Sequence, residues 1–371
     1  MIISIVCIIV FIALIVSFAA YIWVDFYYTG NLEFYNFEEI NTMYAQGDRT
    51  YFITATGYGY VFGDWSGSDY RYYRNAESKK LGDTQWAAPV KISDMKLSRI
   101  IPCKLGAFLI TEHGELFCAT DNQILKYPIS NVVDVVFHEK SQQLLYVSAD
   151  NTLYCLDCNN ASYPLRNEIS QIILCKNQIF YLDIYGNLFS GNWNSQDILI
   201  ENEKLLYDNV SLFDVEDNGV FNAPFNFDTA LLTVLTDNGD LYCKGLYHPS
   251  IGYQYLTDYP PTVKLEDWTL LGSNIVNFST SAMGTVMLHK DGCVSYYGYD
   301  TTCDRWIGKK DFTIDDAVFV LSENGYICVK QKSGRWLFWG DSWRNQFCGV
   351  EKHTHSITSI EDGGTVLEVL P

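Results

Sequence analysis

The body of the chain is made of short apolar and aromatic runs separated by polar turn signals. Seven times an apolar run meets a turn residue, an aromatic-rich run and then a small residue. Apolar and polar residues that alternate over four to eight positions predict half-buried strands, and Asn-Gly or Asp-Gly between them predicts tight hairpins. We therefore expect repeated β-hairpins. The seven copies start at these turn residues: Gly59, Gly114, Asn151, Gly186, Gly239, Gly292 and Gly334.

A further strand is expected ahead of most hairpins, at residues 132–137, 169–174, 275–278 and 317–321. Each unit then has at least three strands, with room for a fourth. A lone hairpin is marginally stable in water, so the units must pack on one another. A ring of four-stranded blades protects its strand edges, whereas an open solenoid would need capping repeats. We predict an all-β, seven-bladed β-propeller over residues 40–371, with a C-terminal hairpin at 356–369 closing the ring against the first copy.

The first 24 residues have a different pattern. Residues 2–24 carry no charge, and as a helix these 23 residues would span about 34 Å, enough to cross a hydrocarbon core of about 30 Å. We predict one membrane-spanning anchor at 1–24 and a connector at 25–39, with signal cleavage after 17–19 as the alternative. No Lys or Arg precedes Arg49, so the positive-inside rule does not set the orientation. We place the body outside the cytoplasm, although the ten cysteines that follow Cys7 favour the opposite side.

The charge of the chain restricts its partners. The formal net charge is −19 over 371 residues. Nucleic-acid affinity depends largely on Lys and Arg that displace counterions, so direct binding of DNA or RNA is disfavoured. Solubility is the simplest role of this charge, and docking of a basic protein is the alternative.

The later copies resemble the repeat of the RCC1-like (regulator of chromosome condensation) seven-bladed propellers. The seventh copy carries it best, with Gly-Arg-Trp-Leu-Phe-Trp-Gly at 334–340 and Asn-Gln-Phe-Cys-Gly at 345–349; the sixth has Tyr-Gly at 297–298 and Trp-Ile-Gly at 306–308. The third and fourth copies lack the second phrase. The resemblance implies a scaffold that binds other proteins, in a family that includes exchange-factor domains for small GTPases, chromatin binders, ubiquitin-ligase accessory domains and a β-lactamase inhibitor. We can place no exchange-factor residue on this chain, and the chromatin role relies on a basic surface that this chain lacks.

The sequence offers little chemistry. His353 and His355 form an H-x-H without a third metal ligand, and Cys155 and Cys158 form a C-x-x-C without a second pair. Cys118, Cys155 and Cys243 occupy the small-residue position of their copies, which favours free buried thiols over disulfides. We predict no catalytic residues, no cofactor and no metal. The alternatives are a propeller hydrolase acting on carbohydrate or peptide, a regulator of a small GTPase and a structural surface component.

Aromatic residues in and beside the loops are the candidate partner-binding residues. Tyr and Trp are enriched at the energetic centres of protein interfaces. The alternative is that they pack beneath their own loops. We predict a membrane-anchored scaffold that binds a protein or peptide, not nucleic acid, through these residues: Trp65, Tyr70, Tyr73, Trp193, Tyr247, Tyr255, Trp306 and Trp343.

Overall fold

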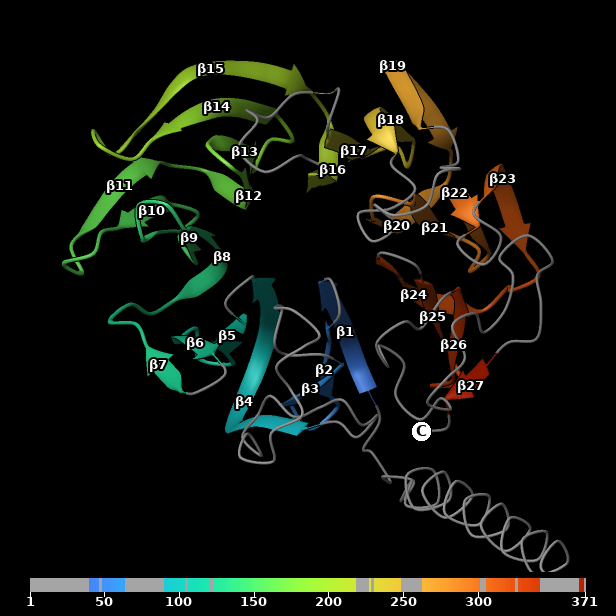
Figure 1. Ribbon diagram of the computed structural model, residues 1–371, viewed down its shortest axis with the longest axis horizontal. Helices are drawn as coiled ribbons and strands as arrows, with labels where there is room; N and C mark the ends of the chain where they lie inside the picture. The colour runs from blue at the N-terminus through green and yellow to red at the C-terminus, as the bar shows by residue number, and fades with distance from the viewer. Residues whose placement is uncertain are drawn as a thin grey trace, which may run out of the picture.

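The computed structural model shows an all-β propeller (Figure 1). It describes residues 40–46, 49–63, 90–103, 106–120, 123–217, 227, 230–247, 262–300, 305–323, 326–340 and 367–369. Every regular element in these residues is a strand, and none of them forms a helix long and apolar enough to span a membrane. The predicted anchor at 1–24 and the connector at 25–39 lie outside the described residues.

The strands of the first three sheets follow chain order from the axis outwards. The first sheet contains β1 (Ile40–Gln46), β2 (Arg49–Thr54), β3 (Tyr58–Gly63) and the start of β4 (Val90–Cys103). The second contains the rest of β4, β5 (Gly106–Thr111), β6 (Leu116–Thr120) and β7 (Ile124–Lys126). The third contains β8 (Val132–His138), β9 (Gln143–Ser148), β10 (Leu153–Leu156) and β11 (Ser162–Arg166).

Four more sheets complete the ring in the same order. The fourth contains β12 (Ile169–Cys175), β13 (Gln178–Asp183), β14 (Leu188–Asn194) and β15 (Leu199–Tyr207). The fifth contains β16 (Val210–Asp217), β17 (Ala230–Thr236), β18 (Leu241–Tyr247) and β19 (Val263–Gly272). The sixth contains β20 (Ile275–Thr280), β21 (Gly284–His289), β22 (Val294–Asp300) and β23 (Arg305–Phe312). The seventh contains β24 (Ala317–Glu323), β25 (Tyr326–Gln331), β26 (Trp336–Gly340) and β27 (Leu367–Val369).

Strand β4 belongs to two sheets. Lys91 and Lys96 pair with β3, whereas Leu97 to Cys103 pair with β5. The described strands therefore form seven four-stranded sheets, although the first two are continuous through β4. The strands expected ahead of the hairpins are confirmed, and they are the innermost strands β8, β12, β20 and β24.

The ring closes by packing between the first and seventh sheets. Phe52 and Met43 pack there against Tyr326, Cys328 and Trp336 in one buried cluster. The prediction that the C-terminal hairpin would close the ring against the first copy is wrong as to the strand: β27 pairs with β26 inside the seventh sheet. Residues 356–366 lie outside the described residues. A similar buried cluster fills each of the other six boundaries between neighbouring sheets.

Each hairpin between the second and third strands turns in the same way. The fourth residue of the turn donates its N–H to the carbonyl of the first, as from Gly239 to Thr236 (2.9 Å), and has a positive φ, 85° at Gly239. Asn238 does not have a positive φ. The turn is therefore not the two-residue type that the Asn-Gly sequence suggested, in which both residues would need a positive φ. In the first copy the positive-φ residue is Gly57 (88°), not the predicted Gly59.

Candidate functional site

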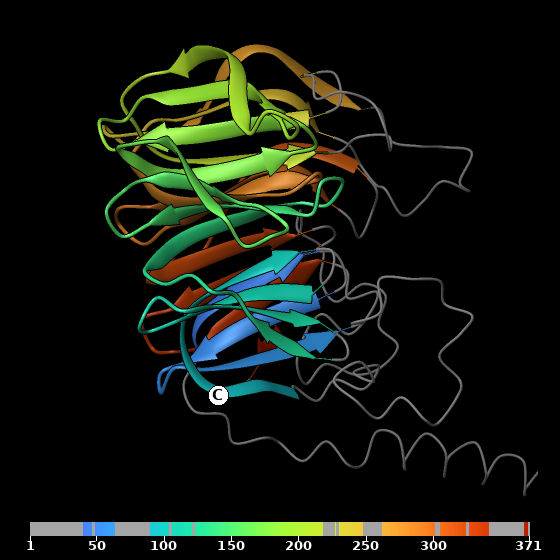
Figure 2. The same ribbon diagram turned by 90° about the vertical axis from the view of Figure 1, so that its left-hand side faces the viewer.

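The propeller has two faces, which Figure 2 shows from the side, with the strands running between them. We call the face that carries the seven hairpin turns the turn face. There the turns bond the junctions on either side of them: the N–H of Ile275, at the start of the next sheet, donates to the carbonyl of Gly239 (2.9 Å), and the N–H of Asp237 donates to that of Asn209, just before the first strand of its own sheet (2.8 Å). The first of these bonds recurs from the first turn to the sixth, and the second recurs from the second turn to the seventh. Turns and the junctions between sheets therefore form one continuous, ordered surface.

Exposed carboxylates gather on the turn face from the third sheet to the sixth. One lysine, Lys290, lies in the same described turns and junctions. Exposed apolar side chains lie among these carboxylates: Ile184 (48 % exposed), Tyr185 (64 %), Val276 (51 %) and Val318 (43 %). We call the following carboxylates the acidic arc: Asp150, Glu168, Asp208, Asp237, Asp291 and Asp315.

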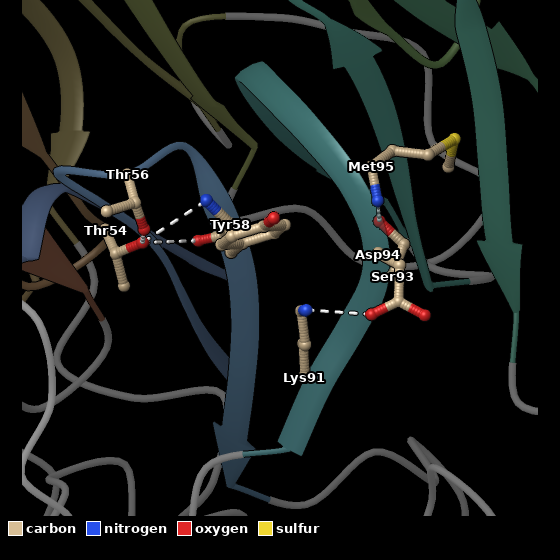
Figure 3. Close-up of polar contacts among 7 residues, drawn as sticks. All are labelled: Thr54, Thr56, Tyr58, Lys91, Ser93, Asp94 and Met95. Atoms are coloured by element: carbon tan, nitrogen blue, oxygen red, sulfur yellow. Dashed lines mark hydrogen bonds and ion pairs between the residues drawn. The ribbon is translucent and has the colours of Figure 1, made fainter.

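The first sheet bounds the acidic arc. Its turn is uncharged, and the hydroxyl of Thr54 contacts that of Thr56 (3.0 Å) and accepts the N–H of Tyr58 (3.2 Å), as Figure 3 shows. The ammonium of Lys91 lies 3.9 Å from the centre of the Tyr58 ring and donates to Asp94 (2.8 Å). This turn therefore contributes no carboxylate of its own, and the lysine beside it is paired with Asp94.

Side chains near the axis tie several sheets to the innermost strand of the next. Arg99 donates to the carbonyl of Val133 (3.0 Å), and Gln171 donates to that of Phe213 (2.9 Å). Where the sheets close, Lys330 donates to the carbonyl of Ile40 (2.7 Å). An innermost strand has no β-partner on its axial edge, so these bonds occupy backbone groups that the sheet leaves open.

Two carboxylates, Asp134 and Asp214, also bond backbone groups of neighbouring innermost strands, but only one of them has a cation beside it. Asp134 accepts the N–H groups of Val135 (3.0 Å) and Ile172 (3.1 Å), and the guanidinium of Arg99 lies 3.2 Å away. Burial raises the pKa of Asp134 above its ordinary value, and Arg99 opposes that shift. Asp214 accepts the N–H groups of Val215 (2.9 Å) and Thr280, with no cation beside it among the described residues. Its burial therefore raises the pKa of Asp214 to about 6.

This shift predicts how Asp214 affects stability at different pH values. The folded state keeps a proton that the unfolded chain releases near pH 3.8, so the contribution of Asp214 to stability falls as pH rises to about 6 and is constant above it. Asp214→Asn keeps an oxygen acceptor and loses the charge. As the pH is raised from 5 to 7.5, the melting temperature of Asp214→Asn should increase relative to that of wild type at the same pH. A difference that stays constant over this range, as expected for the exposed control Asp237→Asn, would contradict the assignment.

Three predicted partner-binding residues lie in the described part of the chain. Trp193 (4 % exposed) is buried between the third and fourth sheets, and Tyr247 (0 %) is buried between the fifth and sixth. Trp306 is half-buried, with its ring centre 5.5 Å from that of Tyr247 and 4.9 Å from that of Tyr299. The structure thus brings Tyr247 and Trp306 together in an aromatic cluster of the core. The rings of Trp193, Tyr247 and Trp306 therefore pack on neighbouring side chains. This agrees with the alternative given above, in which the aromatic residues pack inside the protein and do not face a partner.

The other five candidates, Trp65, Tyr70, Tyr73, Tyr255 and Trp343, lie outside the described residues, and their role in partner binding stays a prediction. The segments that hold them follow the third strands β3, β18 and β26, which all end on the face opposite the turns. The sequence reasoning concentrated on aromatic residues and missed the acidic arc. The sequence feature that could have indicated the acidic arc is the recurrence of Asp and Glu in the turns.

One histidine contact resembles the pairing used in nucleophilic catalysis. His138 Nδ1 lies 2.5 Å from Ser141 Oγ, and His138 Nε2 lies 2.9 Å from Asn177 Oδ1. His138 is buried, however, and Ser141 also donates to Gln143 Oε1 (2.6 Å). Because Asn177 belongs to the next sheet, we interpret the contact as a brace between the third and fourth sheets.

The described cysteines are free thiols, and the possible metal ligands do not form a cluster among the described residues. Cys118, Cys155 and Cys243 are buried free thiols, whereas Cys158 is exposed. No group of three metal-ligating side chains occurs among the described residues. His353 and His355 lie outside them.

Comparison with known proteins supports the fold. No family model and no curated protein sequence matches this chain. Among solved structures, yeast RCC1 (Prp20), determined with Kap60 bound, is similar with a TM-score of 0.50, 14 % identity and coverage of 77 % of this chain and 78 % of that one. The Cps50 (Swd1) β-propeller domain from Myceliophteria thermophila is similar with a TM-score of 0.51, 7 % identity and coverage of 82 % of this chain and 97 % of that one. Human WBSCR16 is similar with a TM-score of 0.50, 10 % identity and coverage of 74 % of this chain and 84 % of that one. These likenesses identify an RCC1-like β-propeller fold.

Proposed function

We propose that this chain is a protein-binding scaffold whose turn face receives a partner with a basic, partly apolar surface. The observation that carries the proposal is the exposure of Ile184, Tyr185, Val276 and Val318 among the carboxylates of the acidic arc. Single exposed apolar residues are ordinary, but a set on one ordered face with one sign of charge is typical of a recognition surface. The propeller fold is compatible with this role and does not by itself imply it.

The proposal includes the predicted membrane anchor and excludes catalysis by this chain. Residues 2–24 would tether the propeller, with its body outside the cytoplasm, so that the turn face meets its partner close to a membrane. No observation on the described residues favours the hydrolase or the small-GTPase regulator over this role. The candidates Trp65, Tyr70, Tyr73, Tyr255 and Trp343 stay a separate prediction of partner-binding residues.

The test removes the exposed apolar groups of the turn face and compares them with equally exposed groups elsewhere. The turn-face variant carries Ile184→Ser, Tyr185→Ser, Val276→Ser and Val318→Ser. The control carries Leu125→Ser, Leu205→Ser and Leu270→Ser on outer strands, where these side chains are 47 %, 54 % and 50 % exposed. Crosslinking in cells followed by mass spectrometry measures how much partner each full-length chain recovers.

We expect the turn-face variant to recover at least about tenfold less of a partner that the control and wild type recover equally. Recovery should also fall with ionic strength, because exposed charges are screened by salt. Equal recovery by the two variants, or loss by the control alone, would overturn the role of the turn face. Deletion of residues 2–24 should release the chain from the membrane fraction, and retention there would contradict the tether.

A further inference from the structure

Seven residues occupy the same register position, one on each innermost strand. Each lies three residues after the bulge near the start of its strand, and each pairs with the residue three before the turn, as Asp214 does with Thr233. All seven are mostly buried but keep a solvent-accessible fraction, and the second strand of each sheet covers them on the outward side. Solvent therefore reaches them from the axis. We call these residues the axial ring: Tyr44, Ile101, Val136, Ile173, Asp214, Ser279 and Leu321.

The axial ring is apolar apart from one charge. Five of its members present aliphatic or aromatic groups, and the hydroxyl of Ser279 is engaged with Ser322, whose N–H it accepts (3.0 Å). Asp214 is the single charged member. A carboxylate in such surroundings is costly unless a cation accompanies it.

Nothing in the neighbouring strands supplies that cation. Strands β12, β17 and β20, which pack against β16, contain no charged residue, and β13 contains Asp183 at its turn end. Asp134 forms the same kind of backbone bridge and has Arg99 beside it, whereas no cation of the described residues lies beside Asp214. The raised pKa of Asp214 agrees with this, since burial exceeds the effect of its two N–H donors.

We propose that the axial ring is a binding site for a protonated amine on an apolar stem, with the Asp214 carboxylate as its counter-ion. The walls suit an alkyl stem, and one carboxylate suits one positive charge. A divalent metal ion would need several oxygen ligands, which this ring does not offer. The amine could be a small molecule or a lysine side chain of a partner, and the inference stands apart from the acidic arc.

Binding of n-butylammonium to the full-length chain tests the inference, measured by ligand-observed NMR at pH 7.5. We expect saturable binding that weakens at least about tenfold in Asp214→Asn and is unchanged in the control Asp267→Asn, which changes an exposed carboxylate on the outer strand β19. Binding should also weaken as pH falls through about 6, where Asp214 takes up a proton. Methylammonium should bind more weakly than n-butylammonium, and Ile173→Ser should reduce that difference because it removes part of the apolar wall.

Further probes identify the source of the amine. A blocked Gly-Lys-Gly peptide that binds at least as tightly as n-butylammonium, and loses binding when its lysine is acetylated, would indicate a lysine of a protein partner. Binding of n-butylammonium without the peptide would indicate a small amine. Absence of binding by both probes, or equal binding to wild type and Asp214→Asn, would overturn the inference. The turn-face variant should still bind n-butylammonium, so failure of the scaffold proposal leaves this result independent.

Discussion

Gly292→Ala should destabilise the propeller by about 2–3 kcal/mol. Gly292 has a φ of 87°, a conformation that costs a residue with a Cβ roughly 1–2 kcal/mol. A Cβ at this position would lie 2.6 Å from the carbonyl oxygen of Asp315, which is backbone of the next sheet. The turn would have to withdraw, which would strain its bond to the N–H of Ala317 (3.0 Å). Thermal and urea unfolding of the full-length chain measure the loss.

The third sheet provides the matched control for this change. Asn151 holds the same turn position with a φ of 61°, and its carbonyl accepts the N–H of Ile169 (2.7 Å). Asn tolerates this conformation, so Asn151→Gly should change stability by only a few tenths of a kcal/mol. Similar effects of the two substitutions would contradict the account of Gly292 as a residue required by both its φ and its close neighbour.

Phe52→Ala should destabilise the chain by about 3–5 kcal/mol, the usual cost of removing a buried phenyl group. Phe52 is 0 % exposed, and its ring is stacked on that of Tyr60 with the centres 5.3 Å apart. It packs in the cluster that joins the first and seventh sheets. No described strand is shared across this boundary, so side-chain packing and a few hydrogen bonds must hold the ring closed, including one between Thr50 and Tyr326 (2.8 Å).

Hydrogen exchange separates closure from general stability. Phe52→Ala should speed exchange first in β1, β2 and β25, which meet at the closure. Phe213→Ala removes an equally buried ring between the fourth and fifth sheets, and it should speed exchange there instead. If both variants exchanged faster in the same strands, the closure would not be a separate weak boundary of the ring.

Most of the local architecture follows from the sequence. Alternating apolar runs indicated the innermost strands β8, β12, β20 and β24, because each must bury one face in a narrow space between sheets. The recurrence of hairpins indicated a propeller, since one hairpin cannot bury its own apolar face. The prediction placed the first turn at Gly59, although Gly57 precedes it by only two residues. Only Gly57 has the positive φ, and Gly59 instead lies beneath Leu97 of the next sheet.

The candidate site was less predictable, because it depends on distances between sheets. Tyr247 and Trp306 were expected to face a partner, and no local pattern shows that their rings meet each other in the core. The acidic arc collects residues from four sheets, and the axial ring collects one from each of seven. Sequence by itself determined the strands, the turns and the repeat, because these depend on neighbours along the chain. Only the tertiary structure decided that Asp134 has Arg99 beside it while no described cation lies beside Asp214, because burial and charge pairing depend on which sheets lie side by side.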